Sequence, residues 1–547
     1  MSEEHDNGMW EPPVGDDDFK SVRDNRGYFV DKSGLIAKIL RYKGTGSFLI
    51  TRPRRFGKSL NLSMVDAFFN IEYQGNPWFD GLAIAEDAEC MAEMSRYPVI
   101  RLNFKDLDVE SYDSFIHGAM EELSFACRKH KYLLDSDVDD VLKERYSRLL
   151  KMEATESELV TSLKILCEML REHHGVKAIV LIDEYDAPIN KSYRKPSQER
   201  IASFIKRFLS SALKSNESLR FGIITGVMRI AKESLFSGLN NLRTDDVFGG
   251  PFEECFGFTE KEVKAMLKFY GHPEKFEECK EWYDGYRFGD SEMYNPWSVL
   301  CYVDRGFVPR PYWAGTGGDS VMKTMVEDAD ESTMDGLMAL GSGKEVQASM
   351  NDRIVYAEIE KGGDAAYTVL AMAGYLTPSG DRDLVRVPNK EVYGVYLDLI
   401  AGGPDTAARS IRDMFSALRK GNSNTVADCL SGLMRSSLSA RILDSEHAYQ
   451  TFLTGLLMGF CGDYEIYADR LESGEGFADI ALRRKCGTRP NIVMELKRSH
   501  SESEMEKDAW KALKQISDRD YLHGMEGRTL TYGISLFRKK ALVTPGE

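Results

Sequence analysis

The chain has 547 residues, of which 42% are hydrophobic and 29% are charged, and it carries a formal net charge of −16 at pH 7. This length exceeds what one hydrophobic core supports, so we expect two to four domains. The negative charge excludes a protein that coats nucleic acid with its whole surface, and no apolar stretch approaches the roughly 18 residues of a membrane span. The acidic beginning lacks the basic residues of a signal peptide, which predicts a cytoplasmic protein.

The N-terminal half alternates between two kinds of pattern. Residues 1–18 are acidic and contain two prolines, which predicts a disordered tail. From Phe19 onward, short β-branched or apolar runs are separated by long helical patterns, and these runs are 47–51, 98–103, 177–182 and 219–225. Strands that alternate with helices predict a parallel sheet covered on both faces. We therefore expect one α/β domain over residues 19–250.

A phosphate-binding loop is predicted where the first run ends. Gly57-Lys58-Ser59 opens a helical pattern, and this is the back half of a Walker A loop. The glycine lets the backbone approach phosphate oxygens, the lysine reaches the β- and γ-phosphates, and the serine ligates Mg²⁺. The residues that we expect to contact ATP here are Arg52, Arg54, Arg55, Phe56, Gly57, Lys58, Ser59 and Leu60. Arg52 stands at the first glycine position, and a simple helix cap is the alternative for the tripeptide.

A second nucleotide motif follows about 120 residues later, at the spacing that P-loop folds require. The apolar run that begins at Lys177 ends in two adjacent carboxylates, Asp183 and Glu184, which is the form of a Walker B strand. Asp183 would hold Mg²⁺ and Glu184 would polarise the attacking water, whereas solvated acids at a strand end are the alternative. Thr225, at the end of the next strand, is a candidate γ-phosphate sensor. Arg229 is a candidate phosphate contact, with ordinary strand-end and helix-surface roles as the alternatives.

The middle of the chain predicts helices without recognisable chemistry. Thr259 caps an acidic first turn, after which short helices and aromatic turns indicate a smaller helical domain over residues 251–325. Residues 326–424 predict a helical connecting region with one hairpin-like stretch near 365–387. A last α/β unit is expected over 425–547.

This last unit contains a carboxylate–lysine pattern. Asp479 is followed by fifteen residues and then by Glu495-Leu-Lys497 on an apolar strand, whose alternation puts the glutamate and the lysine on one face. Asp479 and Glu495 could bind Mg²⁺ while Lys497 orients water or stabilises developing charge, which is phosphodiester hydrolysis. Glu446 is a candidate additional metal ligand. An edge strand with a surface Glu/Lys pair is the alternative.

The C-terminal end is also where we expect contact with nucleic acid, DNA or RNA. Residues 481–547 carry 14 Lys and Arg against 9 Asp and Glu, a balance of +5 that leaves −21 for the remainder. Lys507, Lys511 and Lys514 follow one face of a predicted helix, on which Lys514 and Gln515 could meet a nucleic-acid backbone. A solvated charged face is the alternative.

Taken together, these motifs resemble the bacterial and archaeal AAA-ATPase-like proteins that carry a C-terminal PD-(D/E)xK nuclease-superfamily domain. The matching stretches are Tyr28–Ser33, Thr51–Met64, Leu181–Pro188, Thr225–Ile230, Trp282–Gly289 and Tyr294–Ser298. The resemblance implies a winged-helix-like domain after the ATPase core and a small restriction-endonuclease-like domain at the C-terminus. It also implies that Tyr28–Lys32 lies near the nucleotide base and that Arg52 belongs to an arginine-rich nucleotide site. One departure is Phe477, where the family usually has arginine two residues before the metal aspartate.

The sequence therefore predicts an ATP-binding P-loop ATPase coupled to a Mg²⁺-dependent nuclease-like domain that acts on nucleic acid. The alternative is a nucleotide-dependent switch whose nuclease-like domain binds without cutting. A metabolic kinase has little support because no acceptor-binding signature is present. Assembly into a homo-oligomer is compatible with either interpretation.

Overall fold

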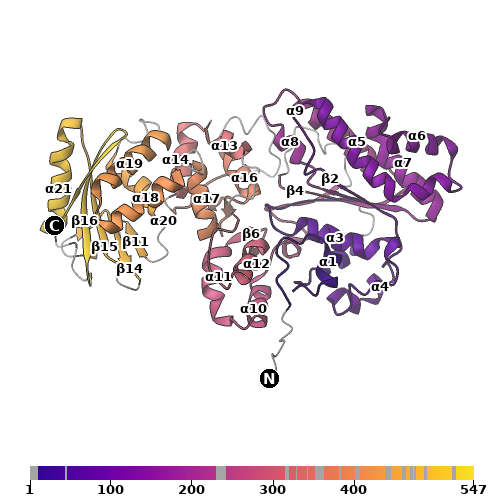
Figure 1. Cartoon of the computed structure of the whole chain (residues 1–547), viewed down its shortest axis with the longest axis horizontal. Helices are drawn as coiled ribbons and strands as arrows, with labels where there is room; N and C mark the ends of the chain where they lie inside the picture. The colour runs from indigo at the N-terminus through magenta and orange to yellow at the C-terminus, as the bar shows by residue number, and fades with distance from the viewer. Residues whose placement is uncertain are drawn as a thin grey trace, which may run out of the picture. The chain divides into compact units, whose positions relative to one another are not determined.

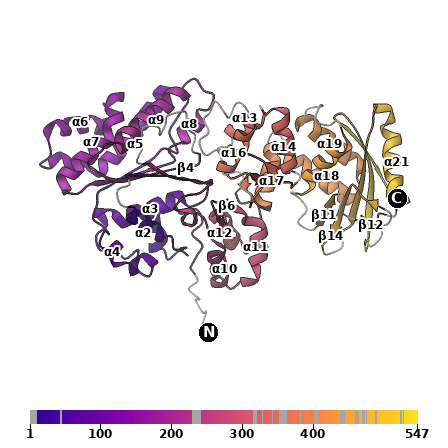
Figure 2. The ribbon, with the colours of Figure 1, turned by 180° about the vertical axis from the view of Figure 1, so that it is seen from behind.

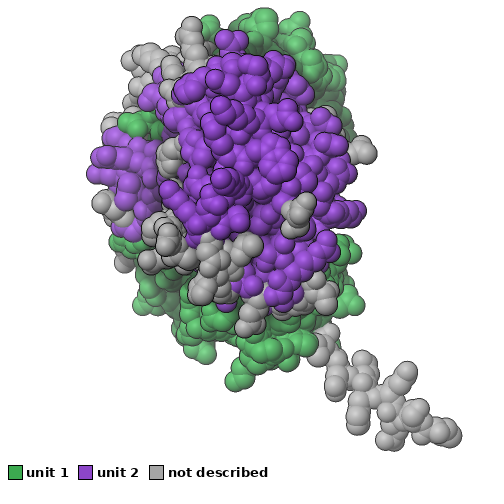
Figure 3. Space-filling model, turned by 90° about the vertical axis from the view of Figure 1, so that its left-hand side faces the viewer, with its two compact units in different colours: residues 1–321, 350–378 green, residues 322–349, 379–547 purple. Residues whose placement is uncertain are grey.

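The computed structural model of the protein divides into two compact units, Met1–Val321 with Met350–Pro378 and Met322–Ser349 with Ser379–Glu547 (Figure 3). The structure describes residues 10–42, 46–228, 242–313, 320–327, 329–341, 343–350, 363–380, 383–400, 407–437, 445–458, 464–468, 472–473, 476–485, 489–519, 521, 525 and 527–546.

The first unit contains a five-stranded, fully parallel sheet in the order β2-β3-β4-β1-β5. Its strands are β1 Ser47–Thr51, β2 Val99–Asn103, β3 Ala178–Asp183, β4 Leu219–Gly226 and β5 Leu242–Asp245. β1 and β3 are buried along their whole length, which a parallel sheet covered on both faces requires. Because β4 lies between β1 and β3, the carboxyl ends of these three strands meet at one edge of the sheet.

Helices cover both faces of this sheet, with α1, α3 and α4 on one face and α5 to α9 on the other (Figures 1 and 2). The helices are α1 Phe19–Asp24, α2 Gly34–Arg41, α3 Lys58–Phe69, α4 Ala88–Met91, α5 Tyr112–Lys129, α6 Asp140–Leu150, α7 Glu156–His174, α8 Ala187–Lys191 and α9 Gln198–Leu213. The predicted α/β class is confirmed.

Local sequence explains where several of these helices begin. Ser111 and Thr155 form capping boxes with the residues three positions later, at the starts of α5 and α7. α3 begins differently, since Gly57 precedes it with a φ of +77°, a backbone conformation that glycine adopts without strain. The left-handed glycine turns the chain sharply from the loop after β1 into α3, so the helix N-terminus lies at the carboxyl edge of the sheet.

A helical region with its own core follows the sheet in the first unit. It contains α10 Glu260–Phe269, α11 Phe276–Tyr283, α12 Pro296–Asp304 and α16 Asp364–Ala373, together with the antiparallel hairpin of β6 Tyr286–Phe288 and β7 Ser291–Met293. The predicted helical middle is confirmed. The hairpin expected near 365–387 is wrong in its first part, because 366–373 form a helix that is buried on all sides and therefore shows no polar periodicity. A short strand, β9 Thr377–Pro378, begins only after it.

The prediction of a disordered tail over residues 1–18 is wrong for its second half, whereas residues 1–9 lie outside the described part. The Trp10 carbonyl accepts a hydrogen bond from the Tyr270 hydroxyl at 2.8 Å, and the Trp10 ring packs against Phe269. Asp18 then accepts from the backbone N–H of Lys20 and caps α1. The contacts of Trp10 and the helix cap formed by Asp18 hold this segment on the folded domain in spite of its acidic composition.

The second unit combines helices with a mixed five-stranded sheet in the order β11-β14-β15-β16-β17. Its helices are α13 Ser320–Glu327, α14 Glu331–Gly341, α17 Lys390–Ile400, α18 Ala407–Lys420, α19 Ser423–Ser437, α20 Glu446–Met458 and α21 Met505–Asp518. Its sheet strands are β11 Tyr464–Ala468, β14 Ile480–Arg484, β15 Asn491–Arg498, β16 Thr529–Phe537 and β17 Lys540–Pro545, and its other strands are β8 Val346–Gln347, β10 Leu384–Arg386, β12 Glu472–Ser473 and β13 Gly476–Phe477. Among the described strands of this five-stranded sheet, β15 and β16 pair in parallel and the other neighbours pair antiparallel, and α21 connects β15 to β16.

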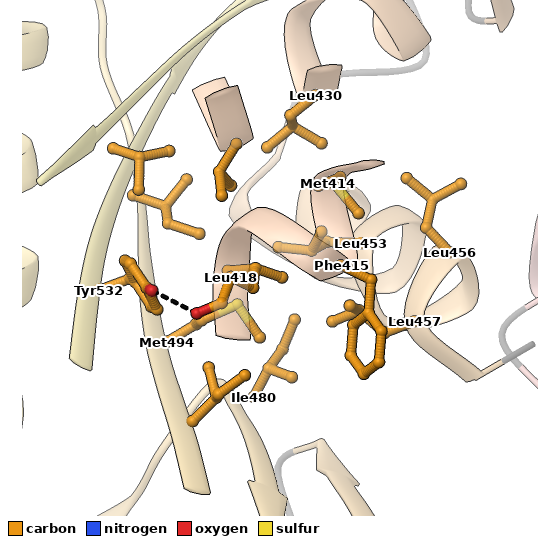
Figure 4. Packing of buried hydrophobic residues seen from close by; sticks show 14 of the residues in the cluster. Met414, Phe415, Leu418, Leu430, Leu453, Leu456, Leu457, Ile480, Met494 and Tyr532 are labelled. Carbon is orange, nitrogen blue, oxygen red and sulfur yellow. Dashed lines mark hydrogen bonds between the residues drawn. The ribbon is translucent and has the colours of Figure 1, made fainter. Parts of the chain in front are cut away.

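The core of the second unit begins earlier in the chain than the predicted boundary at residue 425. Met414 and Leu418 of α18 pack with strand residues such as Met494, and the Tyr532 hydroxyl donates to the Leu418 carbonyl at 2.5 Å (Figure 4). Helix α18 thus belongs to the C-terminal core and does not only connect the domains. Its apolar positions could be recognised in the sequence, but Met494 and Tyr532 lie more than 70 residues further along the chain.

Among the helices that the structure describes, none combines the length and the apolar character that crossing a bilayer requires.

We predict that Leu457→Ala destabilises the second unit by about 2 to 5 kcal/mol, because Leu457 is fully buried in this core and its truncation leaves a cavity. Hydrogen exchange measured by mass spectrometry should show faster exchange in the peptides of α18 and α20, with no change in the peptides of the first unit. Val141→Ala, at a side chain that is 66% exposed, is the control and should change neither set. Unchanged exchange in Leu457→Ala would contradict this assignment of the core.

Candidate functional sites

The carboxylate of Asp183 joins three elements at the carboxyl edge of the parallel sheet. Asp183 ends β3 and is completely buried. Its Oδ2 accepts a hydrogen bond from the Ser59 hydroxyl at 2.5 Å, and its Oδ1 accepts one from the Thr225 hydroxyl at the end of β4. The structure therefore brings together the serine of the glycine-lysine-serine motif, the aspartate of the second motif and the predicted sensor threonine.

Lys58 lies at the same place, on the first turn of α3. Its ammonium donates to the carbonyls of Arg52 and Pro53 at 3.1 and 3.2 Å, and lies 3.7 Å from Glu184 Oε1. Glu184 has a φ of +53°, a left-handed conformation that side-chain-bearing residues adopt at a cost of about 1 to 3 kcal/mol. That conformation directs the chain after β3 back toward the phosphate loop, so the second predicted carboxylate also reaches this site.

We expected the Arg52 side chain to contact ATP, but its guanidinium is fully buried and does not face the phosphate loop. It donates to Asp245 at the end of β5 and to the Thr51 carbonyl, and it lies 4.7 Å from the ring centre of Phe288. Only its backbone carbonyl is directed to Lys58. The residue at the missing glycine position is thus a structural cation that ties β1 to β5, in place of the nucleotide contact that we expected.

The rest of the arginine-rich segment is also held by tertiary contacts. Phe56 is buried and packs edge-on against Tyr286 and Phe288, so its side chain is not available to a nucleotide. The exposed Arg55 stacks its guanidinium on Trp297 at 4.1 Å. Arg54 and Leu60 are half-buried, and Leu60 packs against the core of the sheet domain. Of the eight predicted loop contacts, Gly57, Lys58 and Ser59 are the ones grouped around Asp183 and Glu184.

Gly374, just after α16, contacts this loop from a distant part of the sequence. A side chain at Gly374 would place its Cβ 2.8 Å from Pro53, and the φ of Gly374 is +92°. Only glycine fits both conditions, so the phosphate loop packs closely against residues more than 300 positions downstream.

Asp186 is a functional candidate that the sequence interpretation missed. It is buried and accepts hydrogen bonds from the backbone N–H of Met228 at 2.8 Å, from that of Val227 and from Asn190 Nδ2. Burial, and next the negative charge of Glu184, raise the pKa of Asp186 to about 6. Tyr185 adds a hydroxyl donation to the Met228 carbonyl. Tyr185 and Asp186 thus hold the segment that follows Thr225 in place. In the sequence, the acidic run Asp-Glu-Tyr-Asp was the pattern that could have indicated a role for Asp186.

The segment Tyr28–Lys32 joins the cores of the sheet and of the helical region. Phe29 packs into the first, and Tyr28 into the second beside Tyr270. Lys32 donates to both carboxylate oxygens of Glu262 on α10, at 2.8 and 2.7 Å. Its expected place near the nucleotide base stays a prediction, and Arg229 lies outside the described residues.

A second cluster lies on the C-terminal sheet. Leu496 packs into the core on one face of β15, whereas Val493 packs beneath α21 on the other, so Glu495 and Lys497 lie on the α21 face. The Leu496 N–H donates to Asp479 Oδ2 at 2.7 Å, and the Asp479 N–H donates to Glu495 Oε2 at 3.3 Å. The structure therefore brings the predicted aspartate, glutamate and lysine together.

Charge interactions within this cluster are strong. Burial, and next the charge of Asp479, raise the pKa of Glu495 to about 7. Burial alone would lower the pKa of Lys497, but the charges of Glu446, Glu495 and Asp479 outweigh it, so this pKa lies above its ordinary value. Lys497 Nζ is 3.2 Å from Glu446 Oε1 and 3.5 Å from Glu495 Oε1. The lysine is a permanent cation beside two crowded carboxylates.

Glu446 and Gln515 have partners that sequence reasoning did not assign. Glu446 Oε2 accepts from the Arg498 N–H at 3.1 Å while Oε1 faces Lys497, so both oxygens meet N–H donors. Gln515 of α21 donates to Glu495 Oε1 and lies 3.4 Å from the Tyr521 hydroxyl, away from the nucleic-acid contact expected for it. Nothing is described of the Phe477 side chain.

Oxygen ligands of the kind that Mg²⁺ prefers are present at both places. Within the described ranges, no group of three or more His, Cys, Asp or Glu side chains could hold a metal ion. Mg²⁺ is commonly held by one or two carboxylates together with water and substrate phosphates, so a larger group is not required. The pair Asp479 and Glu495 fits this chemistry, because a cation would relieve the repulsion that raises the pKa of Glu495. Ser59 and Asp183 fit it as a hydroxyl and a carboxylate beside a phosphate loop.

Comparison with known proteins finds two family matches in this chain. Residues 13–236 match the family model described as predicted AAA-ATPase, and residues 444–541 match that of the PD-(D/E)XK nuclease superfamily. An Azotobacter chroococcum mcd 1 protein, described as uncharacterized and in the vnfD 5′ region, is 29% identical over 395 residues, which are 70% of this chain and 68% of that protein.

Among solved structures, the Aeropyrum pernix ORC2 protein (ADPNP-ADP complexes) is similar over 65% of this chain and 87% of that chain, with 7% identity. The TM-score of 0.22 is too low to carry an inference. The two ranges of this chain that the family models match include the residues of the two clusters described above. The chain thus joins an AAA-ATPase-like region to a C-terminal region of the PD-(D/E)XK nuclease superfamily.

Proposed function

We propose that the chain binds and hydrolyses ATP at the Lys58–Asp183 site and cleaves nucleic acid at the Asp479–Lys497 site. The observation that carries the ATPase is the buried carboxylate of Asp183, which accepts from both Ser59 and Thr225. These bonds group a hydroxyl that can ligate Mg²⁺, a strand-end carboxylate and a threonine beside Lys58, which is the set of groups that a Mg²⁺-nucleotide site uses.

At the nucleotide site, each residue has a distinct role. The Lys58 ammonium would exchange the carbonyls of Arg52 and Pro53 for β- and γ-phosphate oxygens, while N–H groups at the start of α3 cradle the phosphates. Ser59 and Asp183 would hold Mg²⁺, which neutralises phosphate charge when bound. Glu184 would polarise the attacking water once Lys58 turns to the phosphates, and Thr225 would contact the γ-phosphate.

At the C-terminal site, Asp479 and Glu495 would hold Mg²⁺, and Lys497 would stabilise the negative charge that develops on the phosphodiester. Glu446 is better assigned to holding the lysine ammonium than to ligating metal, because both of its oxygens face N–H donors. Gln515 orients Glu495 through its amide. This division gives the metal two carboxylates and uses Glu446 to position the lysine ammonium beside them.

The competing function is a nucleotide-dependent switch that binds nucleic acid without cutting it. Phe477, at a position where the resembling proteins have arginine, favours the switch. The grouping of Asp479, Glu495 and Lys497 favours cleavage, and Mg²⁺-dependent cleavage assays with and without ATP distinguish the two.

Lys58→Ala should lower ATP hydrolysis by about 100-fold or more, because one preorganised cation at the phosphates is lost. Phosphate release measures this rate. Lys151→Ala, at an exposed lysine of the same domain, is the matched control and should hydrolyse ATP like the wild type. Wild-type hydrolysis by Lys58→Ala would show that this loop is not the ATP site.

Asp186→Asn should lower kcat for ATP by about 10- to 100-fold while changing the Kd for ATP little. The amide can no longer accept from both Met228 and Val227, so the segment after Thr225 loses its position during hydrolysis rather than during binding. Asp140→Asn, at a carboxylate that is 98% exposed, is the control. An equal loss in binding and in kcat would assign Asp186 to nucleotide binding instead.

Asp479→Asn and Lys497→Ala should each lower Mg²⁺-dependent cleavage of DNA or RNA by about 100-fold or more, and EDTA should stop cleavage by the wild type. Gel assays on labelled strands measure the rates, with the exposed Lys485→Ala as the control. Cleavage that persists in both site variants would come from another site or from a contaminant.

A further inference from the structure

The turn between β16 and β17 is basic and contains no glycine or asparagine. Phe537 pairs with Lys540, so Arg538 and Lys539 form a two-residue hairpin turn. Arg538 and Lys540 are exposed and Lys539 is half-buried. These three consecutive cations lie in residues 481–547, the part of the chain that carries 14 Lys and Arg against 9 Asp and Glu.

Strand register places this turn at the same end of the sheet as Lys497. Lys497 pairs with Ser535 and Arg498 with Leu536 on the neighbouring parallel strand. Arg538 lies two residues beyond Leu536, roughly 7 Å further along β16. Arg498 follows Lys497 toward the turn in this register, and its exposed side chain projects from the opposite face of β15.

Two residues on one face of helix α20 form hydrogen bonds with the turn and with Lys497, the candidate nuclease lysine. The Tyr449 hydroxyl donates to the Arg538 carbonyl at 2.9 Å, and Glu446 accepts from Lys497 at 3.2 Å. Residues three positions apart on a helix lie on the same face, with Cβ atoms about 5 to 6 Å apart. Arg538 and Lys497 are therefore held at a fixed separation by the first turn of α20.

Arginine is an unfavourable residue for the left-handed backbone conformation at the first position of this turn. A two-residue hairpin turn with a left-handed first residue favours glycine there, whereas Arg538 adopts this conformation with a φ of +52°. Strained residues of this kind persist where the surrounding structure or function requires them. Lys540 is 2.5 Å from the exposed Glu502, and Lys539 makes a long hydrogen bond of 3.4 Å to the Arg435 carbonyl. Neither contact involves the Arg538 side chain, whose guanidinium lies 5.2 Å from the ring centre of Phe537.

We propose that Arg538, Lys539 and Arg498 form a phosphate-contacting rim that holds the sugar–phosphate backbone of a polynucleotide beside Lys497. This inference rests on the proposed nuclease function and adds the surface on which its substrate lies. Contacts to phosphate fix the position of a strand without reading its sequence, so the rim serves cleavage without sequence preference. The competing surface is the outer face of α21, where Trp510 is exposed between Lys507 and Lys514.

The test replaces the turn with one that folds better but lacks charge. Arg538→Gly/Lys539→Asn places glycine at the one left-handed position of the turn, so the thermal stability of the full chain should be unchanged or higher. Binding is measured by fluorescence anisotropy in EDTA, with labelled single-stranded DNA, single-stranded RNA and duplex DNA of about 20 nucleotides, from about 50 to 200 mM salt. The matched control is Arg483→Ala/Lys485→Ala, which removes two exposed charges at the end of β14 away from Lys497. Lys507→Ala/Lys514→Ala tests the competing face of α21 separately.

The turn variant should lose affinity for at least one probe that the wild type binds, and the slope of log K against log salt should become shallower by about 1.4 to 1.8, at roughly 0.7 to 0.9 per phosphate contact. The control should keep the wild-type slope. Wild-type affinity and slope in the turn variant would overturn the rim, and so would an equal loss in the control.

The outcomes separate the rim from the nuclease proposal. If the turn variant loses binding and neither the wild type nor the variant cuts nucleic acid, the rim is supported and the nuclease proposal is wrong. Cleavage by the wild type with unaltered binding by the turn variant removes the rim alone. A wild-type protein that binds none of the three probes would overturn both the rim and the nuclease proposal.

Discussion

The buried carboxylate of Asp183 is the constraint on which the geometry of the ATPase site depends. A fully buried carboxylate needs hydrogen-bond donors, and Asp183 obtains them from Ser59 on α3, from Thr225 at the end of β4 and from the N–H of Glu184. These bonds fix the start of α3 and the ends of two strands relative to one another. Lys58, next to Ser59, is thereby placed among phosphate-loop carbonyls and within 3.7 Å of Glu184.

The C-terminal site follows the same physical rule with different residues. Two carboxylates close together and partly buried repel each other, which the raised pKa of Glu495 reflects, and a cation relieves that repulsion. Lys497 supplies one positive charge, and Glu446 on α20 holds its ammonium in place. In both units the acids that could bind Mg²⁺ lie beside a lysine that could meet phosphate, which is the arrangement that phosphoryl transfer and phosphodiester cleavage share.

The sequence predicted those parts of the sites that depend on local order. Gly57, Lys58 and Ser59 are consecutive, and strand alternation alone puts Glu495 and Lys497 on one face. The roles of Arg52 and Gln515 could not be predicted, because their partners lie 193 and 20 residues away and are brought near only by tertiary packing. An arginine beside a phosphate motif favours a phosphate contact in the sequence, whereas full burial against Asp245 makes it structural. The fold class was predictable from alternating patterns, but the membership of α18 in the C-terminal core depends on contacts with strands far along the chain.

The most direct test of the ATP site is a structure of the full chain with Mg²⁺ and a non-hydrolysable ATP analogue. We expect the Lys58 ammonium on the β- and γ-phosphates, Ser59 and Asp183 at the metal, and the Arg52 guanidinium still buried on Asp245. A nucleotide bound elsewhere, or a Lys58 that keeps its bonds to the carbonyls of Arg52 and Pro53 with the analogue present, would contradict the account.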